Sequence, residues 1–379
     1  MDPSMSAGQR IRVGLLFGGR SVEHEVSIAS ATSILRALDP QKYEPVPVGI
    51  DKQGRWWYCA QPPTLTEVFR RGRRVFLLPE PGSAGLRSLD ANDHPVVVAV
   101  DVFFPVLHGT FGEDGTVQGL LELAGIPYVG AGVLASAVGM DKDVQKRLFD
   151  REGLPVVTWL TVHRADWEKQ PQQILAEIRR QFRMPVFVKP ATLGSSVGMT
   201  RVQQEEALEA AIVQALAYAE KILIERAVDA REIEVSVLGN EEPQASLPGE
   251  IVPHREFYDY AAKYLEPGTE LLVPAPLLRR QVLKLQTYAV RAFRAIGAEG
   301  MARVDFFLER PTGRIYINEI NTIPGFTAIS MYPRLWEASG LGYRELIDRL
   351  IALALERHRQ RQRTRYSYDP PPGSAGVLG

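Results

Sequence analysis

The chain has 379 residues, which is longer than one typical domain, so we expect two or three domains with substantial hydrophobic cores. Its 44 basic and 45 acidic side chains give a formal net charge of -1, and this balance excludes a general attraction to nucleic acid or to an anionic membrane. The single cysteine, Cys59, excludes an internal disulfide and a cysteine-rich zinc site, and it fits a cytoplasmic protein.

The N-terminal part of the chain has the pattern of a parallel-sheet α/β domain, which we place at residues 1–139. Strands are predicted at 11–17, 44–50 and 95–104, and helices at 27–38 and 116–125. The apolar stretch 95–107 is interrupted by Asp101 and is shorter than the ~20 residues of a membrane helix, so it predicts a buried strand. Residues 1–10 lack the apolar core of a signal peptide, and we expect a frayed N-terminus there.

The middle of the chain has the pattern of a small α+β domain, which we place at residues 140–228. A helix at 141–153 begins it. After this helix, short strands at 156–162, 185–191 and 221–227 alternate with amphipathic helices at 172–181 and 205–219.

The C-terminal part predicts a second α+β domain at residues 229–379. Its elements are a strand at 232–239, a helix at 277–297, a hairpin at 302–320 and a final helix from Tyr343. The segment 247–276 is long for a connection, and its aromatic residues Phe257, Tyr258, Tyr260 and Tyr264 favour a functional lid over a solvated linker. A basic run followed by Pro and Gly predicts a disordered tail from about residue 360.

The predicted hairpin places two carboxylates opposite each other. If its turn is symmetric about Thr312, Asp305 faces Glu319 and Arg303 faces Asn321, all on one sheet face. Two facing carboxylates repel unless a cation joins them, and carboxylate and amide oxygens are ligands that Mg²⁺ prefers. The alternative is a solvated sheet face with a chance acidic pair, since a bulge would break the register.

Further motifs are compatible with phosphate binding or with ordinary turns. Lys189 ends a predicted strand just before a Gly/Ser loop at 194–198, whose backbone N–H groups can face a phosphate. Such a loop is most often a simple turn, and it differs from the GxxxxGK[ST] motif. Glu23 follows a loop that departs from the dinucleotide-binding motif and can be a polar first-turn residue. His108 can be a hydrogen-bonded histidine at a strand end.

Taken together, several strings resemble the D-alanine D-alanine ligase family of the ATP-grasp superfamily. They are FGGRSVEHEVS, FPVLHGTFGEDGTVQGLLELAGIPYVG, MDK at 140–142, VKPATLGSSVGM, FYDYAAKY, ARVDFF and NEINTIPGFT. The resemblance runs from about Arg12 to Leu355. It implies an ATP-grasp architecture in which ATP is held between the central and C-terminal domains.

The resemblance also implies roles for individual residues. The nucleotide would be held by Lys142, Lys189, Ser196, Glu225, Arg226, Ala227, Val228 and Glu232. Two Mg²⁺ ions, which Mn²⁺ can replace, would be bound by Asp305, Glu319 and Asn321. The first D-alanine would lie beside Glu23, Ser195, Tyr264 and His108. Arg303 and the backbone of Gly325 would receive the oxyanion, Ser330 and Met331 would hold the second carboxylate, and Lys263 would reach the transferred phosphate.

The implied activity is ATP-dependent joining of two D-alanine molecules through an acylphosphate, as a step of peptidoglycan precursor synthesis. Tyr264, after the lid lysine, favours this dipeptide over a D-alanine D-lactate product. A catalytically silent ATP-binding regulator is the alternative from another class, although such a protein would not need Lys189, Arg303 or Asp305. The family further suggests a cytoplasmic homodimer that binds neither nucleic acid nor membrane.

Overall fold

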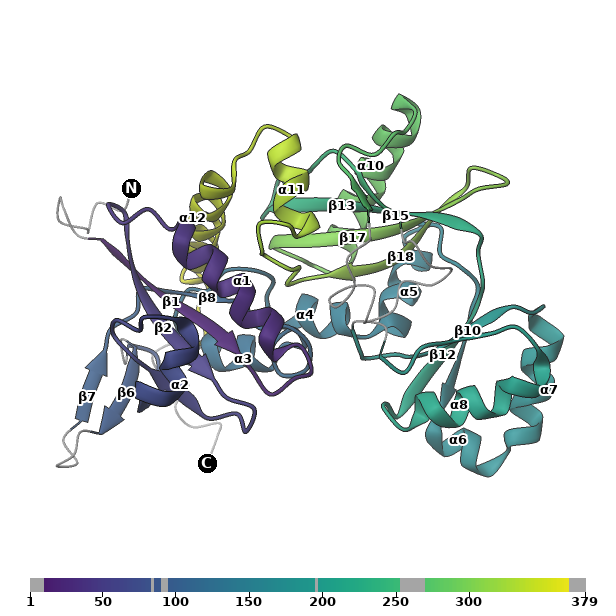
Figure 1. Ribbon diagram of the computed structural model, residues 1–379, viewed down its shortest axis with the longest axis horizontal. Coiled ribbons are helices and arrows are strands. Elements are labelled where there is room, and N and C mark those ends of the chain that lie inside the picture. The colour runs from purple at the N-terminus through teal and green to yellow at the C-terminus, as the bar shows by residue number, and fades with distance from the viewer. Residues whose placement is uncertain (1–9, 83–84, 90–94, 195–196, 253–269, 368–379) are drawn as a thin grey trace, which may run out of the picture.

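The computed structural model describes residues 10–82, 85–89, 95–194, 197–252 and 270–367. Within these ranges the strands form four sheets. Figure 1 shows an N-terminal group of elements in purple and blue at one end of the long axis and a teal group at the other end. The green and yellow elements of the C-terminal part lie between these two groups. None of the helices in the described ranges is long and apolar enough to cross a membrane.

The N-terminal group is built on a mixed sheet whose central strands are parallel. Its strand order is β4-β3-β2-β1-β8, and β1 pairs in parallel with both β2 and β8. The elements are β1 (Ile11–Gly18), α1 (His24–Ala37), β2 (Tyr43–Ile50), β3 (Trp56–Tyr58), η1 (Leu65–Glu67), α2 (Val68–Arg71), β4 (Arg73–Arg74), β8 (Val102–Pro105) and α3 (Thr116–Leu123). The predicted strands and helices of this region, with one exception, are confirmed.

The exception is the predicted single strand at 95–104, which is wrong because two strands share it. β7 (Pro95–Val98) joins an antiparallel sheet with β5 (Phe76–Leu77) and β6 (Leu86–Leu89), whereas β8 joins the parallel sheet. Asp101 lies between them, and its carboxylate accepts two hydrogen bonds from the Arg12 side chain at 3.0 and 2.6 Å. This polar anchor at the sheet edge interrupts the apolar run.

The second group is a four-stranded antiparallel sheet with helices on one face. Its strand order is β11-β10-β12-β9. The elements are α4 (Val133–Met140), α5 (Lys142–Arg151), β9 (Trp159–His163), α6 (Arg164–Lys169), α7 (Pro171–Gln181), β10 (Val186–Pro190), β11 (Thr200–Val202), η2 (Glu205–Ala207), α8 (Leu208–Leu216) and β12 (Lys221–Arg226). Of these, α4, α6 and β11 were not predicted. Alternate residues of β10 and β12 pack against α6, α7 and α8, which leaves the other residues of each strand on the opposite face.

The third group is an antiparallel sheet with the order β16-β15-β13-β17-β18, and β14 pairs beside β13. The elements are β13 (Ala230–Gly239), β14 (Gln244–Ala245), β15 (Gly249–Val252), β16 (Glu270–Leu272), α10 (Arg279–Ala295), β17 (Gly300–Glu309), β18 (Ile315–Asn321), α11 (Met331–Ala338) and α12 (Tyr343–Arg361). Helices α5 and α10 pack on one face of this sheet. The predicted segment 247–276 begins and ends as strands, its residues 253–269 lie outside the described ranges, and α11 was not predicted.

Helix α12 returns to the N-terminal group, and Figure 1 shows it beside α1. One hydrophobic cluster contains residues of α1, β1 and β8 together with Phe326 and residues of α12. Arg357, which is buried, donates hydrogen bonds to the backbone carbonyls of Tyr128 and Gly130 and lies over the Tyr128 ring. The last helix therefore fixes the N-terminal group against the third sheet.

Asp143 joins α5 to the second sheet. Its carboxylate accepts hydrogen bonds from Thr161 and Trp159 of β9 and from Arg147 of α5, and Lys221 of β12 lies 3.3 Å away. Burial alone would raise the pKa of Asp143, but these hydrogen bonds and the lysine charge lower it to about 2. The stabilisation is therefore complete above a pH of about 4 and is lost as the pH falls toward 2.

We predict that Asp143→Asn lowers the free energy of unfolding by ~1–2 kcal/mol at pH 7, since solvent screens part of the pKa shift. The difference from the wild type should shrink between pH 4 and pH 3. Urea unfolding at pH 7, 4 and 3 measures it. Asp150→Asn, an exposed change on the same helix, is the control and should have little effect. An equal loss for Asp143→Asn at every pH would contradict the prediction.

Candidate active site

The hairpin of β17 and β18 brings the predicted metal ligands together. Asp305 and Glu319 are direct cross-strand partners, and so are Arg303 and Asn321. The pairing expected from the sequence is therefore confirmed. Because direct partners lie on the same face of a sheet, all four side chains form one polar patch.

The assumption of symmetry about Thr312 is nevertheless wrong. Nearer the turn, Phe306 pairs with Ile317, which is one residue out of step with the predicted register. The β-bulge at Asn318 adds one residue to β18 and restores the predicted pairs beyond it. As a result Ile317 and Ile320 both face the core, although they are three residues apart. The register near the turn differs from the predicted one by one residue, and the bulge removes this difference before Asp305 and Glu319.

A third carboxylate continues the row. Glu234 of β13 is the direct partner of Asp305, so Glu234, Asp305 and Glu319 lie side by side on three adjacent strands. Arg303 balances them: its Nε lies 2.7 Å from Asp305 Oδ1 and 3.0 Å from Glu234 Oε2, and its Nη2 lies 2.7 Å from Asp305 Oδ2. Burial disfavours the guanidinium charge, but the carboxylates outweigh burial and raise the pKa of Arg303.

The donor set at this patch fits a hard divalent cation. Asp305, Glu319 and Asn321 offer two carboxylates and an amide oxygen, which suit Mg²⁺. Asn321 donates its Nδ2–H to Asp305 Oδ2 at 3.0 Å, an orientation that leaves its amide oxygen for a ligand role. In the described part of the chain, no group of three or more His, Cys, Asp or Glu is arranged to hold a metal, and the predicted set combines two carboxylates with one amide.

Two lysines face the carboxylates. Lys142, the first residue of α5, lies with Nζ 2.8 Å from Glu319 Oε2 and donates to the carbonyl of Leu193 at 3.1 Å. Lys189 of β10 points to the free face of the second sheet, because its neighbour Val188 packs into the core under the helices. Its Nζ lies 2.8 Å from Glu225 Oε2 on β12. The site thus alternates positive and negative groups across the gap between two sheets.

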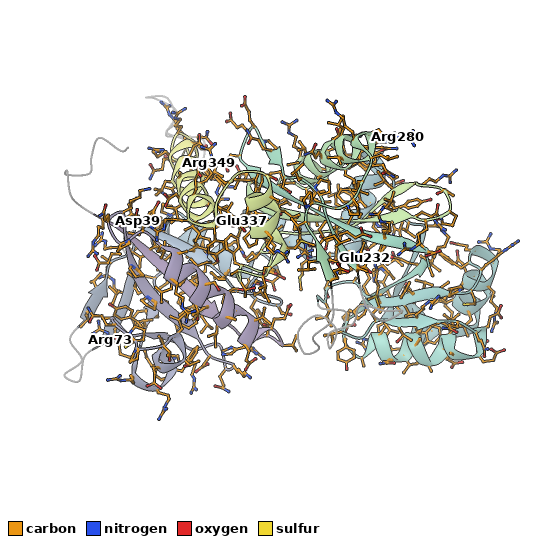
Figure 2. The ribbon with its side chains drawn as sticks, turned by 45° about the horizontal axis from the view of Figure 1, so that its top comes forward. Asp39, Arg73, Glu232, Arg280, Glu337 and Arg349 are labelled. Atoms are coloured by element: carbon orange, nitrogen blue, oxygen red, sulfur yellow. The ribbon has the colours of Figure 1, made fainter. Side chains whose placement is uncertain are left out.

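These residues line one cleft of about 650 Å³ between the second and third sheets. Seven of the residues expected at the nucleotide contribute to it: Lys142, Lys189, Glu225, Arg226, Ala227, Val228 and Glu232. Figure 2 shows Glu232 where the third sheet faces the second group. Glu319 and Asn318 also line the cleft, whereas Arg303, Asp305 and Asn321 are not among its lining residues, so the polar patch meets this space through Glu319.

The N-terminal group contributes Glu23 and His108, which are both buried. Glu23 Oε2 lies 3.5 Å from the position that a Cβ would take on Gly194, so the carboxylate meets the start of the predicted phosphate loop. The same oxygen would lie 2.9 Å from a Cβ on Gly109, a residue with a φ of 77°. Residue 109 therefore requires glycine for both its backbone conformation and its contact with Glu23.

His108 connects the N-terminal group to the loop after β18. Its Nδ1 lies 3.1 Å from the carbonyl oxygen of Ile323, which can only accept, so Nδ1 carries a proton. Ser30 Oγ lies 3.4 Å from His108 Nε2 and accepts the Phe326 N–H at 3.3 Å. Ser30 and His108 thus hold the backbone on both sides of Gly325.

Glu113 favours the charged form of His108. Burial lowers the pKa of His108, but the Glu113 carboxylate, 3.6 Å from Nδ1, outweighs burial with help from Glu23 and raises it. Burial and the charge of Glu23 raise the pKa of Glu113 against the opposing effect of His108. The carboxylate of Glu113 also accepts the N–H of Gly109 at 3.0 Å.

The loop that precedes α11 carries the last predicted residues. A Cβ on Gly325 would lie 3.0 Å from Ser330 Oγ, so this position leaves little room for a side chain. Ser330 is the N-cap of α11, and its Oγ accepts the Thr327 N–H at 3.0 Å. The Met331 side chain is buried against Leu335, so only its backbone N–H, in the first turn of α11, suits a carboxylate.

Several predicted residues lie outside the described ranges. They are Ser195, Ser196, Lys263, Tyr264 and the lid aromatics Phe257, Tyr258 and Tyr260. Their roles, like the individual roles of the residues above, stay predictions.

Sequence reasoning missed five residues of this region: Ser30, Glu113, Lys146, Glu234 and Asn318. Lys146 follows Lys142 at helical spacing, and Glu234 follows Glu232 at strand spacing, so both were detectable from periodicity. No local sequence pattern predicts the bulge at Asn318.

Comparison with known proteins was consistent with this geometry. The family model described as D-ala D-ala ligase N-terminus matches residues 12–131, and the model described as D-ala D-ala ligase C-terminus matches residues 148–352. A D-alanine--D-alanine ligase of Solibacter usitatus is 52% identical over 348 residues, covering 92% of this chain and 96% of that protein.

Two solved structures are similar along nearly the whole chain. The D-alanine-D-alanine ligase from Coxiella burnetii matches with a TM-score of 0.81 and 38% identity, covering 93% of this chain and 96% of that chain. A D-Ala:D-Ser ligase from Enterococcus faecalis matches with a TM-score of 0.82 and 34% identity, covering 91% and 100%. The predicted α/β and α+β class with ATP-grasp architecture is confirmed.

We predict that Glu113→Gln lowers the pKa of His108, because the change removes the charge that outweighs burial. NMR titration of the imidazole measures this, with His108 assigned by comparison with His108→Gln. Asp114→Asn is the matched control, since the Asp114 carboxylate accepts the N–H groups of Phe111 and Thr116. An unchanged His108 pKa in Glu113→Gln would contradict the assignment.

Proposed function

The chain belongs to the D-alanine–D-alanine ligase family, and we propose that it joins two D-alanine molecules in an ATP-dependent reaction at the cleft between the second and third sheets. The observation that best supports this location is the contact of Lys142 with Glu319. It places a lysine ammonium, which is a common phosphate-binding group, beside the row of carboxylates. The product, D-alanyl-D-alanine, serves peptidoglycan precursor synthesis.

The first step activates a carboxylate. A carboxylate has no good leaving group, so the carboxylate oxygen of the first D-alanine attacks the γ-phosphorus of ATP and ADP departs, which leaves an acylphosphate. Lys142 and Lys189 would neutralise the phosphates, and Glu225 to Val228 with Glu232 would border the nucleoside. Lys263 and Ser196, by resemblance, would complete the phosphate contacts. The family likeness further suggests that the lid excludes water, which would hydrolyse the acylphosphate.

Asp305, Glu319 and Asn321 would hold Mg²⁺, or Mn²⁺ in its place, and we propose two ions per site. Such ions, when bound, neutralise charge on the triphosphate. Lys142 and Arg303 pair with carboxylates of the same set.

The second step forms the peptide bond. The free amine of the second D-alanine attacks the acyl carbon, and phosphate leaves as the tetrahedral intermediate collapses. Arg303 and the N–H of Gly325 are the proposed donors to the oxyanion of that intermediate. Glu23, with Ser195, Tyr264 and His108, would position the first D-alanine.

The second D-alanine would be held by its carboxylate. Ser330 and the N–H of Met331 are the proposed partners, since they form the N-terminus of α11, where backbone N–H groups favour an anion. We also propose that the protein is a cytoplasmic homodimer with domains at residues 1–139, 140–228 and 229–379.

The test of the reaction is phosphate release from ATP in the presence of Mg²⁺ with D-alanine or L-alanine. We expect release with D-alanine to exceed release with L-alanine by at least an order of magnitude. D-Serine and D-lactate, each added with D-alanine, test the second subsite, and we expect the D-alanine dipeptide to dominate. Equal rates with the two alanine enantiomers would defeat the substrate assignment, and preferred lactate incorporation at neutral pH would replace the proposed product.

We predict that Asp305→Asn and Glu319→Gln each abolish turnover while the chain still folds, because each removes a charged metal ligand. Phosphate release measures turnover, Mn²⁺ titration followed by electron paramagnetic resonance measures metal binding with nucleotide present, and circular dichroism measures folding. Glu337→Gln, an exposed change on α11, is the control. Near-normal turnover and Mn²⁺ binding in both site variants would remove the metal assignment.

A further inference from the structure

Lys146 is a fully buried lysine with a role that the proposed reaction does not assign. It lies on α5 one helical turn after Lys142, and its side chain has no exposed area. It does not line the nucleotide cleft, at least as formed by the described residues. An ammonium group loses its hydration when it is buried and is strongly destabilising unless an opposite charge meets it. This lysine therefore needs a specific partner.

Its partner is Glu225, which is also buried. Lys146 Nζ lies 3.0 Å from Glu225 Oε1, while the other oxygen of the same carboxylate, Oε2, lies 2.8 Å from Lys189 Nζ. The centroid of the Trp159 ring lies 5.8 Å from Lys146 Nζ, so the electron-rich face of the ring is turned toward the ammonium. The result is a chain of three charges, Lys146, Glu225 and Lys189, in which only the last two line the cleft.

The three groups depend on one another. Burial disfavours the charged form of Glu225, but the charges of Lys146 and Lys189 outweigh burial and lower its pKa. Burial lowers the pKa of Lys146 and the charge of Lys189 adds to this effect, while Glu225 opposes both. Glu225 is thus the group that permits two lysines to lie close together in the interior.

The charge balance explains why a second lysine is useful. A pair of Lys189 and Glu225 alone is neutral, so its attraction for a polyphosphate would be weak. With Lys146 added, the three side chains together carry a net charge of +1. Lys146 contacts the Glu225 oxygen that does not contact Lys189. Glu225 then fixes the position of Lys189 without cancelling the positive field that Lys189 directs at an anion.

We propose that Lys146 is a positioning residue for nucleotide binding, which acts through Glu225 to hold Lys189 in place with its charge available to the phosphates. This inference rests on the proposed function, because it takes the cleft to bind a nucleoside polyphosphate. It does not involve the proposed alanine positions, which lie beside Glu23 and at the N-terminus of α11. The effect of Lys146 should therefore appear in nucleotide affinity rather than in alanine affinity.

The experiment measures ADP binding with Mg²⁺ by calorimetry and the KM values for ATP and D-alanine. Lys146→Met removes the charge and keeps a similar stem. We expect it to weaken ADP binding and raise the KM for ATP by at least tenfold, with the KM for D-alanine changed by less than twofold. Lys146→Arg, which keeps the charge, should stay within about threefold of the wild type. Lys169→Met, an exposed change on α6, is the control.

A second measurement separates action through Glu225 from a purely structural role. In the Glu225→Gln background no carboxylate remains for Lys146 to hold, so adding Lys146→Met should change ADP affinity by less than threefold. Lys146→Met alone keeps the neutral pair of Lys189 and Glu225, whereas Glu225→Gln removes the carboxylate beside Lys189, so circular dichroism is recorded for every variant and affinities are compared between folded proteins.

Three outcomes overturn the inference. They are wild-type ADP affinity in folded Lys146→Met, a loss in Lys146→Arg equal to that in Lys146→Met, and the same loss from Lys146→Met in both backgrounds. Failure of the wild-type protein to bind ADP would instead defeat the proposed function, so the two failures are distinguishable.

Discussion

The register of the β17–β18 hairpin is the constraint on which the candidate site depends. A β-strand exposes alternate residues to alternate faces, so a shift of one residue would move Glu319 from the cleft to the core. The bulge at Asn318 makes the shift at a place where it is needed, because it lets Ile317 and Ile320 both stay in the core while Glu319 meets Asp305. The hydrophobic core on one face thereby fixes the positions of the carboxylates on the other.

Charge compensation follows from that placement. The row of Glu234, Asp305 and Glu319 would be repulsive in isolation, and Arg303 and Lys142 relieve the repulsion from two different elements. The same principle operates on the other side of the cleft, where Glu225 separates two buried lysines. A nucleotide with metal ions, as proposed for this cleft, would bring both signs of charge and would exchange with these internal partners without leaving a buried charge unpaired.

The candidate site also depends on contacts between distant parts of the chain. His108 and Ser30, from the N-terminal group, contact Ile323 and Phe326 on either side of Gly325. Ile323 and Phe326 also belong to the hydrophobic cluster that residues of α1, β1, β8 and α12 form. A substrate beside Glu23 would therefore keep a fixed distance from the proposed oxyanion donors, which is what positioning catalysis requires.

The sequence by itself determined most of the longer elements, because their periodicity is local: the β1 strand, the α5 and α10 helices and the β17–β18 hairpin all appear where the pattern predicts them. It also determined the pairing of Asp305 with Glu319, although by an assumption about the turn that was wrong in detail. Family resemblance supplied the individual roles, which stay predictions.

Only the tertiary structure decided the charged partners that come from distant elements. Three such contacts join residues far apart in sequence: Asp101 with Arg12, Lys142 with Glu319, and Lys146 with Glu225. A local pattern cannot specify such pairs, because hydrophobic periodicity indicates which face of an element a residue lies on but not which charged residue of another element lies opposite. Burial then makes each pair energetically decisive, since a charge removed from water is stable only beside its opposite.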